Sequence, residues 1–75
     1  MVASTYLLVW FNSEGRGPSE VTTRLMSLGF KPTKGNYDYI YKWDNHAQVE
    51  DVLRLGDKVH QTLKGLNVLY KLETV

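Results

Sequence analysis

Cysteine is absent from this 75-residue chain, and histidine occurs only twice, as His46 and His60. The lack of cysteine excludes disulfide bonds and thiolate metal sites, and two histidines are too few for a histidine-rich metal site. A domain of this length buries a smaller fraction of its surface than a larger domain does, so its stability is marginal without further support. With disulfides and metals excluded and no cofactor indicated, we expect the chain to be a homodimer or a larger homo-oligomer.

Runs of like charge and long apolar runs are also absent. The formal net charge is +1, and lysines and arginines are scattered among acidic residues, which argues against binding to duplex DNA. No apolar run is long enough to cross a membrane, and no secretory signal is evident at the N-terminus. We therefore expect one cytoplasmic domain, residues 1–75, with neither a membrane nor a DNA partner.

The first half of the chain alternates strand-like and helix-like segments. Residues 6–11, with the sequence YLLVWF, are apolar at both sets of alternate positions, which is typical of a strand covered on both faces. Pro18 suits the first turn of a helix, with Gly17 as its cap and Gly29 as its left-handed end. Residues 30–33 are interpreted as a short edge strand.

A stripe of aromatic residues marks the next strand. A tight turn over residues 34–36 leads into residues 37–43, in which every second residue is aromatic. The stripe consists of Tyr37, Tyr39, Tyr41 and Trp43. Because tyrosine is tolerated on either side of a sheet, the sequence leaves open which face this stripe occupies.

A second helix and a final strand complete the pattern. Asp44 or Asn45 can cap this helix, with Gln48 three residues after Asn45. An apolar stripe at helical spacing predicts the buried side, and Gly65 ends the helix. The stripe consists of Val49, Val52, Leu53, Gly56, Val59 and Leu63. Residues 68–73 alternate between apolar and polar character, as in a half-buried strand.

The predicted order is β-α-β-β-α-β. Right-handed crossovers close this order into an α+β, ferredoxin-like sandwich, in which two helices cover one face of a four-stranded antiparallel sheet. The first and third strands then lie in the middle. Because residues 6–11 are apolar on both sides, the face away from the helices is expected to be apolar and to bind a partner.

The residues around the start of the third strand form a motif that resembles one found in a known family. The sequence resembles the effector-binding domain of Lrp/AsnC regulators and its stand-alone relatives, or a related dimeric ferredoxin-like module with a Gly-x-Tyr-Asp signature. The residues that carry the resemblance are Gly35, Tyr37 and Asp38, followed by YIYKW, and the later Leu63, Lys64 and Gly65. The chain lacks the helix-turn-helix of those regulators. The resemblance implies a dimer packed through bare sheet faces, with small effectors, often amino acids, bound between subunits.

Two groups of candidate residues follow from this resemblance and from the apolar face away from the helices. We expect Gly35, Tyr37 and Asp38 to lie at a ligand-proximal turn. We expect Leu8, Trp10, Tyr39 and Tyr41 to lie in the subunit interface. For Gly35 and Asp38, turn chemistry alone is the competing interpretation, with a positive φ at Gly35 and an Asp38 carboxylate that accepts hydrogen bonds from backbone amides.

An RNA-binding alternative rests on the same stripe. The stretch KGNYDYIY is similar to the aromatic strand of an RNA-recognition motif, in which Tyr37, Tyr39 and Trp10 would stack on bases. Asn36 interrupts that pattern, and Asp38 adds negative charge beside the platform.

No nucleophile with a base and an orienting partner is recognisable, so no catalytic residues are predicted and the chain is not expected to be an enzyme.

Overall fold

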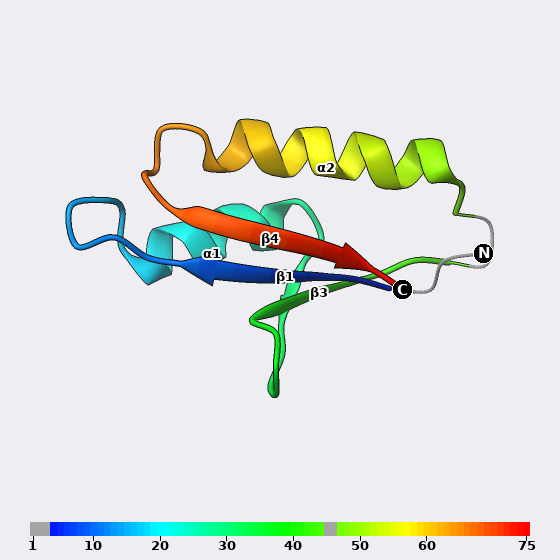
Figure 1. Cartoon of the computed structure of the whole chain (residues 1–75), viewed down its shortest axis with the longest axis horizontal. Coiled ribbons are helices and arrows are strands. Elements are labelled where there is room, and N and C mark those ends of the chain that lie inside the picture. Colours follow the sequence, from blue (N-terminus) through cyan, green and yellow to red (C-terminus); the bar gives the residue numbers. More distant parts are fainter. Residues whose placement is uncertain (1–3, 45–46) are drawn as a thin grey trace.

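The computed structural model describes residues 4–44 and 47–75, and Asn45 and His46 lie outside the described residues. It has the predicted element order, which confirms the α+β class. The elements are β1 (Ser4–Trp10), α1 (Pro18–Ser27), β2 (Lys31–Pro32), β3 (Tyr39–Lys42), α2 (Val49–Leu63) and β4 (Leu69–Thr74). Figure 1 shows α2 along one side of the sheet, while the β2–β3 connection projects to the other side.

The four strands form one antiparallel sheet in the order β2-β3-β1-β4. The first and third strands are therefore central, as the sequence predicts. β1 pairs with β3 from Ser4 to Leu7 and with β4 from Thr5 to Trp10. Pro32 lacks an N–H group and lies in an edge strand, where the missing donor costs no ladder hydrogen bond.

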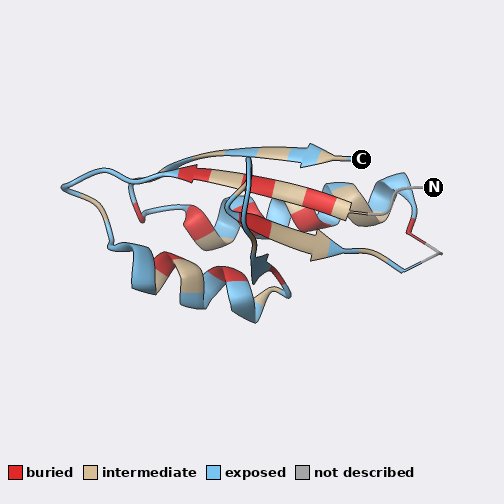
Figure 2. Cartoon of the chain, turned by 90° about the horizontal axis from the view of Figure 1, so that it is seen from below, coloured by how far each residue is buried: buried red, intermediate tan, exposed pale blue. Residues whose placement is uncertain are grey.

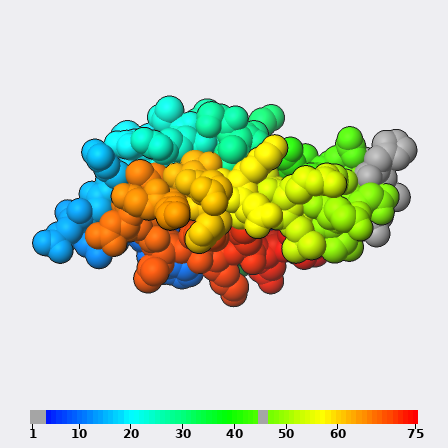
Figure 3. Space-filling model, turned by 90° about the horizontal axis from the view of Figure 1, so that it is seen from above, coloured from blue at the N-terminus to red at the C-terminus, as the bar shows by residue number. Residues whose placement is uncertain are grey.

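The core lies between the sheet and the two helices. Thr5, Leu7 and Val9 are the buried set of β1, and the intervening residues are less buried, as the alternating colours of β1 in Figure 2 show. Helix α1 contributes Val21 and Leu25 to the core. The contribution of α2 consists of Leu55, Val59 and Leu63. Figure 3 shows the two helices side by side over this face of the molecule.

The limits of α1 follow the predicted signals. The helix starts at Pro18 with Gly17 as its N-cap. Beyond its end, Gly29 has a φ of +107°, in the region that favours glycine. A Cβ atom at Gly29 would lie 2.8 Å from Cε2 of Tyr41, so glycine also makes room for the Tyr41 ring.

Helix α2 corrects two predictions. Its N-cap is Gln48 rather than Asp44 or Asn45, and a capping box with Asp51 closes the first turn. The predicted apolar stripe is also partly wrong, because Val49 and Leu53 are exposed while Leu55 is buried. The predicted stripe with Leu53 and the observed stripe with Leu55 both have helical spacing. The packing of α2 against the sheet buries the stripe that contains Leu55.

The third strand is shorter than predicted. Pairing starts at Tyr39, and the chain bends away from the sheet at Asp38. Strict alternation would place Tyr37 on the same face as Tyr39, but the bend carries Tyr37 to the opposite face, where its ring meets Tyr6. The aromatic stripe is therefore divided between two sides of the sheet.

Candidate functional site

The face of the sheet opposite the helices carries a group of apolar side chains that we call the open face. Tyr6, Leu8 and Trp10 alternate with the buried set of β1, and β3 adds Ile40 beside Tyr6. Leu69 of β4 pairs with Trp10 and lies on the same side. Trp10 is 52% exposed and Leu69 is 73% exposed. Two large apolar side chains thus lie next to each other at one end of this face.

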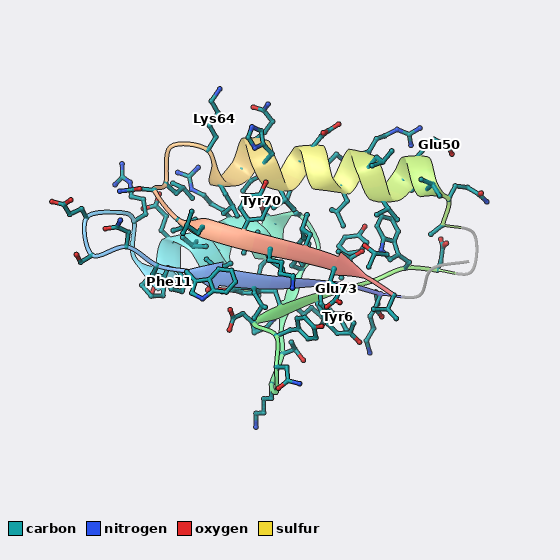
Figure 4. All side chains as sticks on the ribbon, in the orientation of Figure 1. Tyr6, Phe11, Glu50, Lys64, Tyr70 and Glu73 are labelled. Atoms are coloured by element: carbon teal, nitrogen blue, oxygen red, sulfur yellow. The ribbon has the colours of Figure 1, made fainter. Side chains whose placement is uncertain are left out.

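Tyr37 covers part of the open face. Its ring stacks on Tyr6, with the ring centroids 4.6 Å apart and the planes at 28°. Its hydroxyl donates a hydrogen bond to the Glu73 carboxylate on β4. Figure 4 shows Tyr6 and Glu73 near each other on this side of the sheet, whereas Tyr70 lies between β4 and α2. Tyr37 therefore reaches across β1 from the β3 side to β4.

The Glu73 carboxylate changes the acidity of this phenol. The hydrogen bond to Glu73 raises the pKa of Tyr37 above its ordinary value, and desolvation and the negative charge of Glu73 act in the same direction. Ionisation of Tyr37 would remove the donor and place two negative charges side by side. The contact consequently favours the neutral phenol.

Asp38 completes the sheet where β3 leaves it. Its backbone N–H donates to the carbonyl of Leu7 over 3.0 Å. Its Oδ2 accepts a hydrogen bond from the backbone N–H of Val9, also over 3.0 Å. The carboxylate thus takes the place that a backbone carbonyl of a longer β3 would occupy. This agrees with the expected role of Asp38 as an acceptor for backbone amides, although the amide belongs to a strand rather than to the turn.

Charged residues flank the apolar centre of the open face on both sides. Lys31 pairs with Ile40 at the level of Tyr6, and Asp38 lies beside Leu8. On the β4 side, Glu73 lies at the level of Tyr6 and Lys71 at the level of Leu8. At each of the two levels, one edge carries a cation and the other an anion.

The predicted ligand-proximal residues are close in sequence but have different surroundings. Gly35 has a φ of +100°, as the turn interpretation predicts, and no atom would contact a Cβ added there. Tyr37 and Asp38 point back to the sheet, where each is bound by a partner on another strand. The three residues therefore form a projecting turn with an anchored base rather than a closed pocket.

The four predicted interface residues do not share a face. Leu8 and Trp10 lie on the open face, but Tyr39 is buried on the helix side and its hydroxyl lies 2.5 Å from the Thr22 hydroxyl. Tyr41 is half-buried on the same side as Tyr39 and packs edge-on against Phe30. An interface on the open face would include Leu8 and Trp10 but not the two tyrosines, because alternation in β3 turns them inward.

The sequence leaves open whether Ile40 or the aromatic stripe lies on the open face, and Leu69 was overlooked as a member of it. The register could have identified Ile40 and Leu69, since residues opposite one another on neighbouring strands point to the same side.

Residues 4–44 and 47–75 contain no group of three or more acidic or histidine side chains able to hold a metal ion. In the same residues, no helix has the length and apolar character of a membrane span.

Comparison of the chain with family models, with curated proteins and with solved structures finds no match.

Proposed function

We propose that this chain is a non-catalytic, ferredoxin-like module that self-associates through its open face. The order β-α-β-β-α-β, with β1 and β3 central, supports the ferredoxin-like arrangement. The observation that carries the proposal is the apolar centre of the open face, where Trp10 and Leu69 are exposed next to Leu8. A patch with an apolar centre and a charged rim has the composition of a protein interface.

A second copy of the chain suits this rim. A two-fold axis parallel to β1 would place the β4 edge of one subunit over the β2–β3 edge of the other. Glu73 would then oppose Lys31 of the second subunit, and Lys71 would oppose Asp38, because each pair lies at the same level along β1. Opposite charges would meet at both levels, so the surface is complementary to itself.

A small effector forms a further part of this proposal. The turn that includes Gly35, Tyr37 and Asp38 projects on the side of the open face and would stand at the subunit boundary (Figure 1). An amino acid or a similar small molecule would bind there, as the resemblance to Lrp/AsnC effector domains implies. A cytoplasmic location fits a chain without cysteine.

The test is the mass in solution, measured by light scattering on a size-exclusion column over a range of protein concentrations. The wild type should elute as a dimer or a larger assembly. Leu69→Lys should raise the dissociation constant by about tenfold or more, because a charge replaces an apolar side chain at the interface. Since Leu69 is exposed, the monomer should still fold.

The matched control is Leu53→Lys on α2. Leu53 is 64% exposed, close to the 73% of Leu69, but it lies away from the open face. This variant should keep the mass of the wild type. If Leu53→Lys dissociates the assembly and Leu69→Lys does not, the interface lies on α2 and the proposal fails.

A monomer at every concentration would also contradict self-association and would leave RNA as the partner to test. The stacked Tyr6 and Tyr37 rings and the flanking Lys31 and Lys71 offer aromatic and cationic groups on the open face. Tyr39 does not take part in such a platform, because it is buried. Binding of oligouridylate that weakens with added salt would then support the RNA interpretation.

A further inference from the structure

A hollow lies on the helix side of the sheet, where the ends of α1 and β3 meet the first half of α2. Its volume is about 280 Å³. Tyr41 and Trp43 form one wall, and Leu28 and Leu55 contribute apolar surface. Arg54 and Lys58 lie on the α2 side. A space of this size suits a small ligand, since pockets for drug-sized molecules run from about 300 to 1,000 Å³.

The aromatic wall is held in place from behind. The indole Nε1–H of Trp43 donates a hydrogen bond to Thr5 Oγ1 over 2.8 Å, and that oxygen lies 2.8 Å from Thr74 Oγ1. The rings of Tyr41 and Trp43 contact each other with centroids 4.7 Å apart. Gly29 leaves the space that the Tyr41 ring occupies. Both rings are thus positioned before any ligand binds, which lowers the entropy cost of binding.

The α2 wall carries an excess of positive charge. Arg54 and Lys58 are four residues apart and therefore lie on the same side of the helix. Asp51 accepts hydrogen bonds from Arg54 Nη1 over 3.0 Å and from the backbone N–H of Gln48 over 2.9 Å. The charge of Asp51 is thus matched by Arg54, and within the described residues Lys58 makes no ion pair.

We propose that this hollow binds a small aromatic monocarboxylate. Its ring would pack against Tyr41 and Trp43, and its carboxylate would pair with Lys58 and with the exposed side of Arg54. A planar ring suits the aromatic wall, and one negative charge matches that of Lys58, for which the described residues provide no ion pair. The hollow lies on the opposite side of the sheet from the open face, so the proposal does not depend on self-association.

Nuclear magnetic resonance of the two tryptophan indole N–H groups tests this proposal. The variant Trp43→Phe assigns the two signals. Titration with phenylacetate should shift the Trp43 signal to saturation and leave the Trp10 signal on the open face unchanged. Phenylacetamide, which has the same shape without the charge, should bind about tenfold more weakly. Equal affinity for the two compounds would overturn the ionic part of the proposal.

Two lysine variants complete the test. Lys58→Gln should weaken phenylacetate binding by about tenfold. Lys64→Gln is the matched control, because Lys64 is exposed at the other end of α2 and points away from the sheet (Figure 4). It should bind phenylacetate as the wild type does. A Trp43 signal that responds to neither compound, or an equal loss in both variants, would overturn the site.

Discussion

At the residue scale, Tyr37 connects three strands with one side chain. It precedes β3, stacks on Tyr6 of β1 and donates its hydroxyl proton to Glu73 of β4. The sequence predicts a strand residue at this position, and neither contact follows from the alternation of residues 37–43. A bend of the backbone at Asp38 produces both contacts, and such a bend depends on a partner elsewhere in the fold.

The raised pKa of Tyr37 leads to a prediction about alkaline stability. A folded-state pKa above the unfolded value of about 10 means that the folded chain retains a proton that the unfolded chain loses. The contribution of this contact is complete below that pH and is lost as the pH rises through the folded-state pKa. The free energy of unfolding, measured by urea denaturation at increasing pH, should therefore fall less steeply above about pH 10 in Tyr37→Phe than in the wild type.

The control for this measurement is Tyr70→Phe. Tyr70 is half-buried on β4 and lies on the helix side of the sheet. Because Tyr70 lies on the other side of the sheet from Glu73, a shallower slope in Tyr37→Phe than in Tyr70→Phe would trace the effect to the contact with Glu73. If Tyr37→Phe and the wild type lose stability in parallel, the hydrogen bond to Glu73 does not persist in solution.

At the element scale, β3 is a short strand, and the Asp38 carboxylate provides the hydrogen-bond acceptor that a longer β3 would provide with a backbone carbonyl. Asp38→Ala should remove the acceptor for the Val9 N–H, which should cost about 1 kcal/mol because this hydrogen bond is only partly buried. Asp38→Asn keeps an acceptor oxygen and should cost less than about 1 kcal/mol. Urea denaturation gives both values, and hydrogen exchange at the Val9 amide should accelerate in the alanine variant. Equal losses in the two variants would show that the carboxylate has another role.

The elements differ in how far the sequence predicts them. The limits of α1 were predictable because Gly17, Pro18 and Gly29 act locally, through backbone conformation and the missing N–H of proline. The buried side of α2 was not predictable in full, because Leu53 and Leu55 both belong to stripes of helical spacing. The choice between them depends on contact with the sheet, which is tertiary information.

The candidate surfaces likewise divide into a part that local sequence predicts and a part that depends on tertiary contacts. Alternation along β1 correctly places Leu8 and Trp10 on the open face. The assignment of Tyr39 and Tyr41 to that face could not be checked from sequence, since tyrosine suits both sides. The register of β1 with β3 determines it, and a register involves two segments that are distant in the chain.

At the scale of the whole molecule, a small core and an exposed apolar face lead to a prediction about thermal stability. If folding and self-association are coupled, the melting temperature should rise with protein concentration. Calorimetry at several concentrations should show this rise for the wild type and for Leu53→Lys but not for Leu69→Lys. A melting temperature that is independent of concentration in the wild type would contradict the coupling.

The strand order also bears on how the chain folds during synthesis. β1 lies between two partners, and its contact with β4 joins Thr5 to Thr74, 69 residues apart. Contacts at such separation close late, because a long loop must lose its conformational entropy first. A nascent chain that ends before Leu69 can build both helices and the β1–β3 pair but leaves one edge of β1 open. On the ribosome, that edge would be exposed to other chains until the last strand emerges.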